Sequence, residues 1–244
     1  MSTTVTIDPK YKIEIIFAGS GGMYPYYFGI SEILQQHFDL SDVFFSATSG
    51  GCYAPMFLSS NKNIVEYFKK IQDYIFNELE ESYTGTFFKL NKIIFDLTKK
   101  IFNTNDILKI NNKFVCRCSL IKNISNPYSW KAVYFNKWDN VEDFANCIKA
   151  SSYLPIYGTE LLSKYKGNYY ADGIFTHNTK ESVSNLPSFV FNLDKWRKIP
   201  ISWYHVYNDY QWGNKLYKMG KEDAIKNLDE IKDFFNKYSS QTYV

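Results

Sequence analysis

The chain has 244 residues, of which 45% are hydrophobic and 22% charged, and its formal net charge is +3. This balance is typical of a globular protein with one sizeable core, so we expect a single domain over residues 1–244. A charge this small excludes a strongly basic nucleic-acid-binding face, and we expect no nucleic-acid partner. It is compatible with contact to an anionic membrane.

The four cysteines Cys52, Cys116, Cys118 and Cys147 show neither a paired disulfide framework nor the spacing of a zinc site. Cys116 and Cys118 share one face of an expected strand, which predicts core thiols rather than a metal site. The first twelve residues lack the apolar run of a signal peptide, and no stretch approaches the ~20 apolar residues of a membrane span. We therefore expect a cytoplasmic protein that is able to contact a membrane peripherally.

The first predicted element is a strand over residues 13–17, followed by a glycine-rich loop over 19–22 and a helix over 26–37. Glycines after a strand let backbone amides approach a negative atom closely, so this loop suits a phosphate site or an oxyanion hole. Tyr24 stands where a dinucleotide fingerprint needs its third glycine, and the Gly-Lys-Ser/Thr of a Walker loop is absent. A nucleotide-binding domain is therefore the least favoured interpretation, and no cofactor is expected.

A second strand, over residues 43–48, ends at Ser49, and a helical stretch follows to about residue 60. A serine on such a sharp turn exposes its hydroxyl at the end of a sheet and suits a nucleophile. The full pattern is Gly-x-Ser-x-Gly, whereas Ala47 stands at the first glycine here and Gly51 at the second. Two consecutive strand–turn–helix units predict an α/β fold with a parallel sheet.

The remaining chain is predicted to alternate further helices and strands around one sheet. Helices are expected over residues 63–82, 87–102, 141–151 and 221–238, strands over 114–120, 130–135, 188–193 and 201–207, and an irregular connection over 156–166. The helix over 87–102 mixes aromatic and aliphatic residues with lysines. It is interpreted either as a membrane-interface helix or as a surface helix docked on the core. A short apolar segment then delivers Asp172 onto a glycine turn.

Three of these stretches occur in the order of the signatures of the patatin-like phospholipase family, which the chain resembles over residues 12–178. They are the glycine loop, the serine turn at 46–51 and the Asp-Gly pair at 172–173. The segments that most resemble the adiponutrin and adipose triglyceride lipase branch are 17–21 with Gly29, 150–157 and 170–173. The resemblance implies a three-layer α/β/α domain with a mostly parallel central sheet.

The resemblance also implies a lipid acyl hydrolase that cleaves carboxylic esters through a Ser–Asp dyad and an acyl-enzyme intermediate. Ser49 would be the nucleophile and Asp172 the base that takes its proton. The backbone amides of the glycine loop would hold the oxyanion, at Gly19, Ser20, Gly21 and Gly22. The implied partner is a lipid substrate at a membrane or lipid-droplet surface, with no metal and no cofactor.

Two other interpretations stay open at the sequence level. A Ser–His–Asp α/β-hydrolase would use Ser49, then Asp172 or Asp194, then His205, although its nucleophile usually follows several strands rather than one. A non-catalytic lipid-binding protein of the same fold is suggested by Ala47 and by Ile174, which follows the Asp-Gly pair where many relatives carry a smaller residue.

Overall fold

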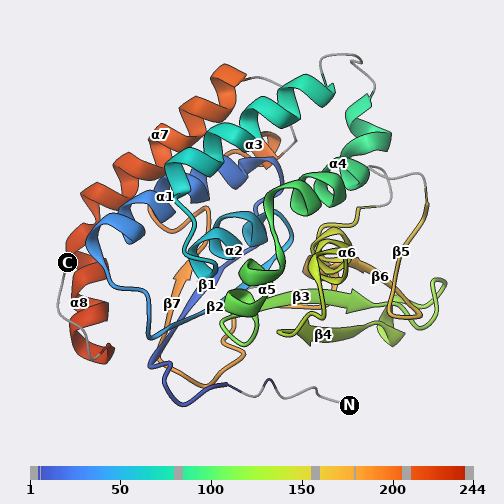
Figure 1. Ribbon diagram of the computed structural model, residues 1–244, viewed down its shortest axis with the longest axis horizontal. Coiled ribbons are helices and arrows are strands. Elements are labelled where there is room, and N and C mark those ends of the chain that lie inside the picture. The colour runs from blue at the N-terminus through green and yellow to red at the C-terminus, as the bar shows by residue number, and fades with distance from the viewer. Residues whose placement is uncertain are drawn as a thin grey trace.

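The computed structural model describes residues 5, 7–79, 85–154, 160–178, 180–204 and 210–239. Within these residues the chain has an α/β architecture, a seven-stranded sheet flanked by helices (Figure 1). The sheet has the order β5-β6-β3-β2-β1-β7, with β4 also paired to β3. The strands are β1 Ile13–Phe17, β2 Val43–Thr48, β3 Phe114–Leu120, β4 Lys131–Phe135, β5 Ser163–Tyr165, β6 Asn168–Asp172 and β7 Ser188–Phe191.

The sheet is mixed, so the expectation of a mostly parallel sheet was wrong. The pairs β1–β2, β1–β7 and β2–β3 are parallel, as the two strand–turn–helix units predicted. The pairs β3–β4, β3–β6 and β5–β6 are antiparallel. In the pair β5–β6 a short connection requires this direction, because a tight turn at Lys166 and Gly167, both with positive φ, joins the two strands and only antiparallel neighbours are joined so briefly.

Helices flank the sheet, consistent with the expected layered α/β/α arrangement. They are α1 Tyr24–His37, α2 Tyr53–Ser59, α3 Ile64–Leu79, α4 Gly85–Ile101, α5 Thr104–Ile110, α6 Val141–Ser151, α7 Tyr210–Lys226 and α8 Leu228–Tyr238. The main core lies where α1, α2 and α6 cover one face of the central strands, and Ile15, Phe45 and Cys116 point into it. None of the described helices is long and apolar enough to cross a bilayer.

Three sequence-based expectations differ from the observed elements. The C-terminal helix expected over 221–238 is two helices, α7 and α8, which meet at Asn227. The strand expected over 201–207 is a 3-10 helix at 201–204, which begins where the Trp203 amide donates to the Pro200 carbonyl, and residues 205–207 lie outside the described residues. The connection expected to be irregular contains β5.

The two helices expected over residues 63–82 and 87–102 are confirmed within the described residues. The helix expected over 63–82 is α3, and residues 80–82 lie outside the described part. The helix expected over 87–102 is α4, whose apolar side chains at Leu90, Ile94 and Leu97 turn toward the interior and line a cavity. This arrangement agrees with the interpretation of α4 as a helix docked on the core.

The second face of the central strands carries a buried polar cluster. The Glu14 carboxylate on β1 accepts hydrogen bonds from the hydroxyls of Ser46, Ser182 and Ser184. The Arg117 guanidinium on β3 lies 3.8 Å from the Glu14 carboxylate and donates to the Ser46 hydroxyl at 2.8 Å. Both charged side chains are almost fully buried, so this cluster fixes Asn178 and the residues 181–184 against the sheet.

Candidate active site

Ser49 and Asp172 come together because two strands end against the same edge of β3. Strand β2 runs parallel to β3 and its last residue, Thr48, lies opposite Arg117. Strand β6 runs antiparallel to β3, and its last residue, Asp172, lies opposite Cys118. The other edge of β3 is occupied by β4 at these positions, so β2 and β6 approach each other head to head.

The turn at Ser49 holds the hydroxyl in a constrained backbone conformation. Ser49 has a φ of +56°, in the left-handed region that residues with a side chain rarely adopt. Its amide donates to the Ser151 hydroxyl at 3.0 Å, and that hydroxyl donates to the Arg117 carbonyl at 2.6 Å. A strained conformation persists only where its surroundings fix it, and here α6 and β3 supply that support through one serine.

The Ser49 hydroxyl donates to Asp172 Oδ2 at 2.5 Å. The other carboxylate oxygen, Oδ1, accepts from the Ile174 amide at 2.9 Å, which fixes the rotation of the carboxylate. The Asp172 backbone is held on both sides, since its amide donates to the Tyr153 carbonyl and its carbonyl accepts from the Ser119 hydroxyl. The pair is therefore a preorganised contact between a hydroxyl and a carboxylate.

Burial raises the pKa of the Asp172 carboxyl to about 7. Only 1% of the residue is exposed, and removal from water disfavours the charged form. The hydrogen bonds from Ser49 and Ile174 stabilise the carboxylate and oppose this rise. A carboxylate with a pKa near neutrality is a far stronger base than an exposed aspartate and still loses its proton at physiological pH.

The glycine-rich loop lies directly against the serine turn. A Cβ placed on Gly51 would come within 2.3 Å of the Ala18 carbonyl oxygen, and one on Gly50 within 2.5 Å of the Gly21 carbonyl oxygen. Only glycine permits these approaches at positions 50 and 51. An ideal Cβ on Gly19 would lie 3.8 Å from Ser49 Cβ, so the loop packs against the serine itself.

The remaining residues of the predicted oxyanion loop follow the turn into α1. Gly21 has a φ of +51° and lines the cavity, and Gly22 is buried in a short 3-10 helix over 21–23. Ser20 is fully buried, its carbonyl accepts from the Met23 amide, and its hydroxyl has no hydrogen-bond partner among the described residues. Gly19, Ser20 and Gly21 thus lie beside the serine turn, and Gly22 follows them along the chain.

Ala47 departs from the elbow pattern without disturbing the turn. It lies inside β2 opposite Phe17 and Cys116, and it is fully buried in the main core. The positive φ falls on Ser49 and the close backbone crossing falls on Gly51, so position 47 has no need of a glycine.

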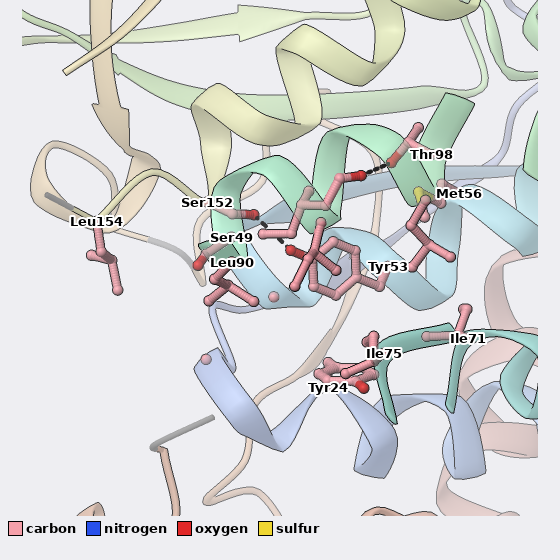
Figure 2. Close-up of a pocket in the computed structure, with 15 residues that line it drawn as sticks. Tyr24, Ser49, Tyr53, Met56, Ile71, Ile75, Leu90, Thr98, Ser152 and Leu154 are labelled. Atoms are coloured by element: carbon pink, nitrogen blue, oxygen red, sulfur yellow. Dashed lines mark hydrogen bonds between the residues drawn. The ribbon is translucent and has the colours of Figure 1, made fainter. Parts of the chain in front are cut away.

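A mostly apolar cavity opens beside Ser49 and holds about 800 Å³ of empty space, including its open part. Figure 2 shows Ser49, Ser152 and Leu154 toward one side, with Met56 and Thr98 toward the other. The walls come mainly from α2, α3 and α4. The apolar lining consists of Tyr24, Tyr53, Met56, Ile71, Ile75, Leu90, Ile93, Ile94, Leu97 and Leu154.

The described histidines do not form a triad with Ser49. His177 Nε2 lies 3.0 Å from the Cys118 carbonyl oxygen, its ring packs edge-on against Tyr134, and burial lowers its pKa. Asp194, the alternative acid of a triad, is exposed, and its backbone amide donates a hydrogen bond to Asn192 Oδ1. His205 lies outside the described residues.

The four cysteines are buried and free, as expected for core thiols. The sulfurs of Cys116, Cys118 and Cys147 lie within 4.8 Å of one another, and Cys52 Sγ lies 4.0 Å from Cys116 Sγ. A soft metal ion is the kind that such a sulfur set would bind, but the thiols would first have to lose their protons. Burial raises the pKa of the Cys52, Cys118 and Cys147 thiols, which favours the protonated form.

Neither the known protein-family models nor the curated proteins give a match to this chain. The function is therefore inferred from the geometry of the site and from the sequence motifs.

Sequence reasoning missed the groups that hold the candidate dyad in place, which are the Ser151 hydroxyl and the Ile174 amide. Ser151 belongs to the stretch that resembles the family, but its contact with the Ser49 amide depends on how α6 packs against β3. The Ile174 amide is invisible in a sequence, because any residue supplies one. The cavity depends on α3 and α4, whose sequences predicted helices but not their distance from Ser49.

Proposed function

We propose that this protein is a lipid acyl hydrolase, of the phospholipase A or acylglycerol lipase type, and that it belongs to the patatin-like family. The hydrogen bond from the Ser49 hydroxyl to the buried Asp172 carboxylate, beside an apolar cavity, carries this proposal. The order of the three sequence motifs supports the same assignment. A layered α/β/α domain of the patatin type is part of the proposal.

In the proposed reaction, Asp172 takes the Ser49 proton as the serine oxygen attacks the ester carbonyl carbon. The resulting oxyanion is stabilised by the backbone amides of the loop over 19–22, and such a donor typically contributes ~3 kcal/mol to the transition state. The intermediate collapses as Asp172 returns the proton to the leaving alcohol. Water, deprotonated by Asp172, then cleaves the acyl-enzyme, which releases a fatty acid and regenerates the Ser49 hydroxyl.

The cavity explains why the substrate would be a lipid rather than a polar ester. Its lining is almost entirely aliphatic and aromatic, so burial of an acyl chain there is favoured by ~0.8 kcal/mol per CH₂ group. Thr98 lies within this lining, but its hydroxyl donates to the Ile94 carbonyl and offers little to a polar ligand. The acyl chain would extend from Ser49 between α3 and α4.

The first experiment has two assays on separate samples. One is labelling by a fluorophosphonate, which reacts with activated serines, and the other is digestion of a mixed lipid extract by unlabelled protein. We expect labelling and fatty-acid release by the native protein and neither by Ser49→Ala. Asp172→Asn should reduce both by at least about a thousandfold. Ser163→Ala is the matched control, because Ser163 is buried and its hydroxyl has no hydrogen-bond partner among the described residues.

Two results would redirect the assignment. Folded protein that neither reacts with the probe nor releases fatty acid would be the non-catalytic lipid-binding protein considered above. Loss of all activity in His205→Gln, with the fold intact, would favour a Ser–His–Asp triad over the dyad.

A further inference from the structure

Large apolar side chains are exposed on two adjoining segments next to the candidate active site. Ile124 and Tyr128 lie in the loop between β3 and β4, and Tyr128 is fully exposed. Ile174 and Phe175 follow Asp172, and each is at least half exposed. The half-buried Trp130 ring packs edge-on against Phe175 and joins the two segments. We call these five residues the apolar rim.

The rim is held in an ordered backbone. The residues 127–129 form a 3-10 turn in which the Trp130 amide donates to the Pro127 carbonyl, and the Trp130 indole donates to the Asn123 carbonyl at 2.9 Å. Tyr128 is therefore presented outward by a hydrogen-bonded turn. Clustered apolar side chains that are kept in water cost free energy, which makes such a patch a candidate contact surface.

The rim reaches the mouth of the catalytic cavity. An ideal Cβ on Gly19 would lie 3.9 Å from Ile174 Cδ1 and 3.8 Å from Ser49 Cβ. Ile174 is also the residue whose amide binds the Asp172 carboxylate. A partner that covers Ile174 consequently lies close to Ser49.

Two lysines lie at the ends of the loop that carries Ile124 and Tyr128, whereas the exposed Glu181 lies beyond Phe175 and accepts a hydrogen bond from the Asn178 side chain. The residues 121–131 include Lys122 and Lys131, both exposed, and contain no Asp or Glu. Within 168–178 the single carboxylate is Asp172, which is buried. Aromatic side chains beside lysines are the pattern of surfaces that rest in the headgroup region of a bilayer.

We infer that the apolar rim is a membrane-docking surface that places the Ser49 mouth against a bilayer containing anionic lipid. The inference rests on the proposed function for its purpose, because a lipid hydrolase must draw its substrate out of a membrane. Ile124, Tyr128 and Phe175 would enter the headgroup boundary while Lys122 and Lys131 contact anionic headgroups. A protein partner would not need a rim that lies beside an apolar cavity.

The test measures binding without catalysis, so that its failure is separate from failure of the proposed function. Ser49→Ala protein is sedimented with sucrose-loaded vesicles made of phosphatidylcholine alone, or of phosphatidylcholine with about 30 mol% phosphatidylserine. We expect stronger binding to the anionic vesicles. Adding Ile124→Ser and Tyr128→Ser should weaken the partition about tenfold. Lys122→Gln with Lys131→Gln should remove most of the preference for the anionic vesicles.

The matched control is Leu108→Ser with Ile225→Ser, which removes two apolar side chains, 69% and 51% exposed, from α5 and α7. This control should bind vesicles like the parent. Equal binding by the rim variant and the control would overturn the inference. So would failure of the parent protein to bind vesicles while it binds native membranes in a protease-sensitive way, since that result identifies a protein partner.

Discussion

Ser49 and Asp172 occupy neighbouring positions on one edge of β3, although 123 residues separate them in the chain. The parallel strand β2 brings the serine from one direction and the antiparallel strand β6 brings the aspartate from the other. The antiparallel half of the sheet is thus what completes the candidate dyad. An all-parallel sheet would carry β6 past this point in the opposite direction.

The pH dependence of activity should report the Asp172 carboxyl. Its pKa is raised to about 7 by burial, and only the deprotonated form takes the Ser49 proton. We expect kcat/KM on a soluble short-chain ester to rise about tenfold per pH unit below pH 7 and to level off above it. A profile that is flat between pH 5 and pH 8 would contradict the assignment of Asp172 as the base.

The same pKa has a consequence for stability, with the opposite sign. Because the folded-state pKa lies above the ordinary value of an aspartate, the folded protein binds the extra proton between about pH 4 and pH 7. The stabilisation is present below this window and is lost as the pH rises through about 7. The native protein should therefore lose stability in urea unfolding as the pH rises from 5 to 8, whereas Asp172→Asn should not. The difference in unfolding free energy between the two should shift in favour of the variant over this range.

Replacement of Ser151 by alanine should damage the candidate site without touching the dyad. The change removes the acceptor of the Ser49 amide and the donor to the Arg117 carbonyl, both buried. We expect a loss of about 1–3 kcal/mol in unfolding free energy and a fall of about 10- to 100-fold in the rate of fluorophosphonate labelling. Ser163→Ala should leave both quantities nearly unchanged, and equal effects of the two substitutions would contradict a positioning role.

The sequence predicted the parts of the fold that local patterns determine. Short apolar runs followed by glycine-containing turns located β1, β2 and the Ser49 turn, and helical periodicity located α3, α4 and α6. The break between α7 and α8 was missed because Ala224, Leu228 and Ile231 keep helical spacing across Asn227, although asparagine is a residue that often ends a helix. The 3-10 helix at 201–204 was missed because its apolar residues also suit a strand.

The candidate site was predictable in its reacting groups but not in its surroundings. Ser49, Asp172 and the loop over 19–22 occur in motifs whose order indicated a shared site. The direction of β6, the support from Ser151 and the cavity between α3 and α4 all depend on contacts between distant residues. Such contacts leave no local periodicity, so a single sequence does not contain them in readable form.

Restoring the glycine of the elbow pattern should not improve the protein. Ala47 lies within β2, has an ordinary strand conformation and fills part of the main core. Ala47→Gly should therefore change ester hydrolysis by less than about twofold, while it lowers the free energy of unfolding by about 1 kcal/mol, because glycine weakens a strand. An increase in activity of tenfold or more would show that the alanine strains the elbow.

The buried polar cluster behind the sheet should be a major contributor to stability. Glu14 is fully buried and accepts hydrogen bonds from three serines, and Arg117 beside it is 1% exposed. Glu14→Ala would leave the Arg117 charge without its carboxylate, and breaking a buried pair in this way typically costs about 3–5 kcal/mol. Lys92→Ala, which breaks the exposed pair with Asp96 on α4, should cost far less, because water screens that pair. Urea unfolding of both variants measures the difference, and a cost below about 1 kcal/mol for Glu14→Ala would mean that water or a rearranged loop replaces the carboxylate.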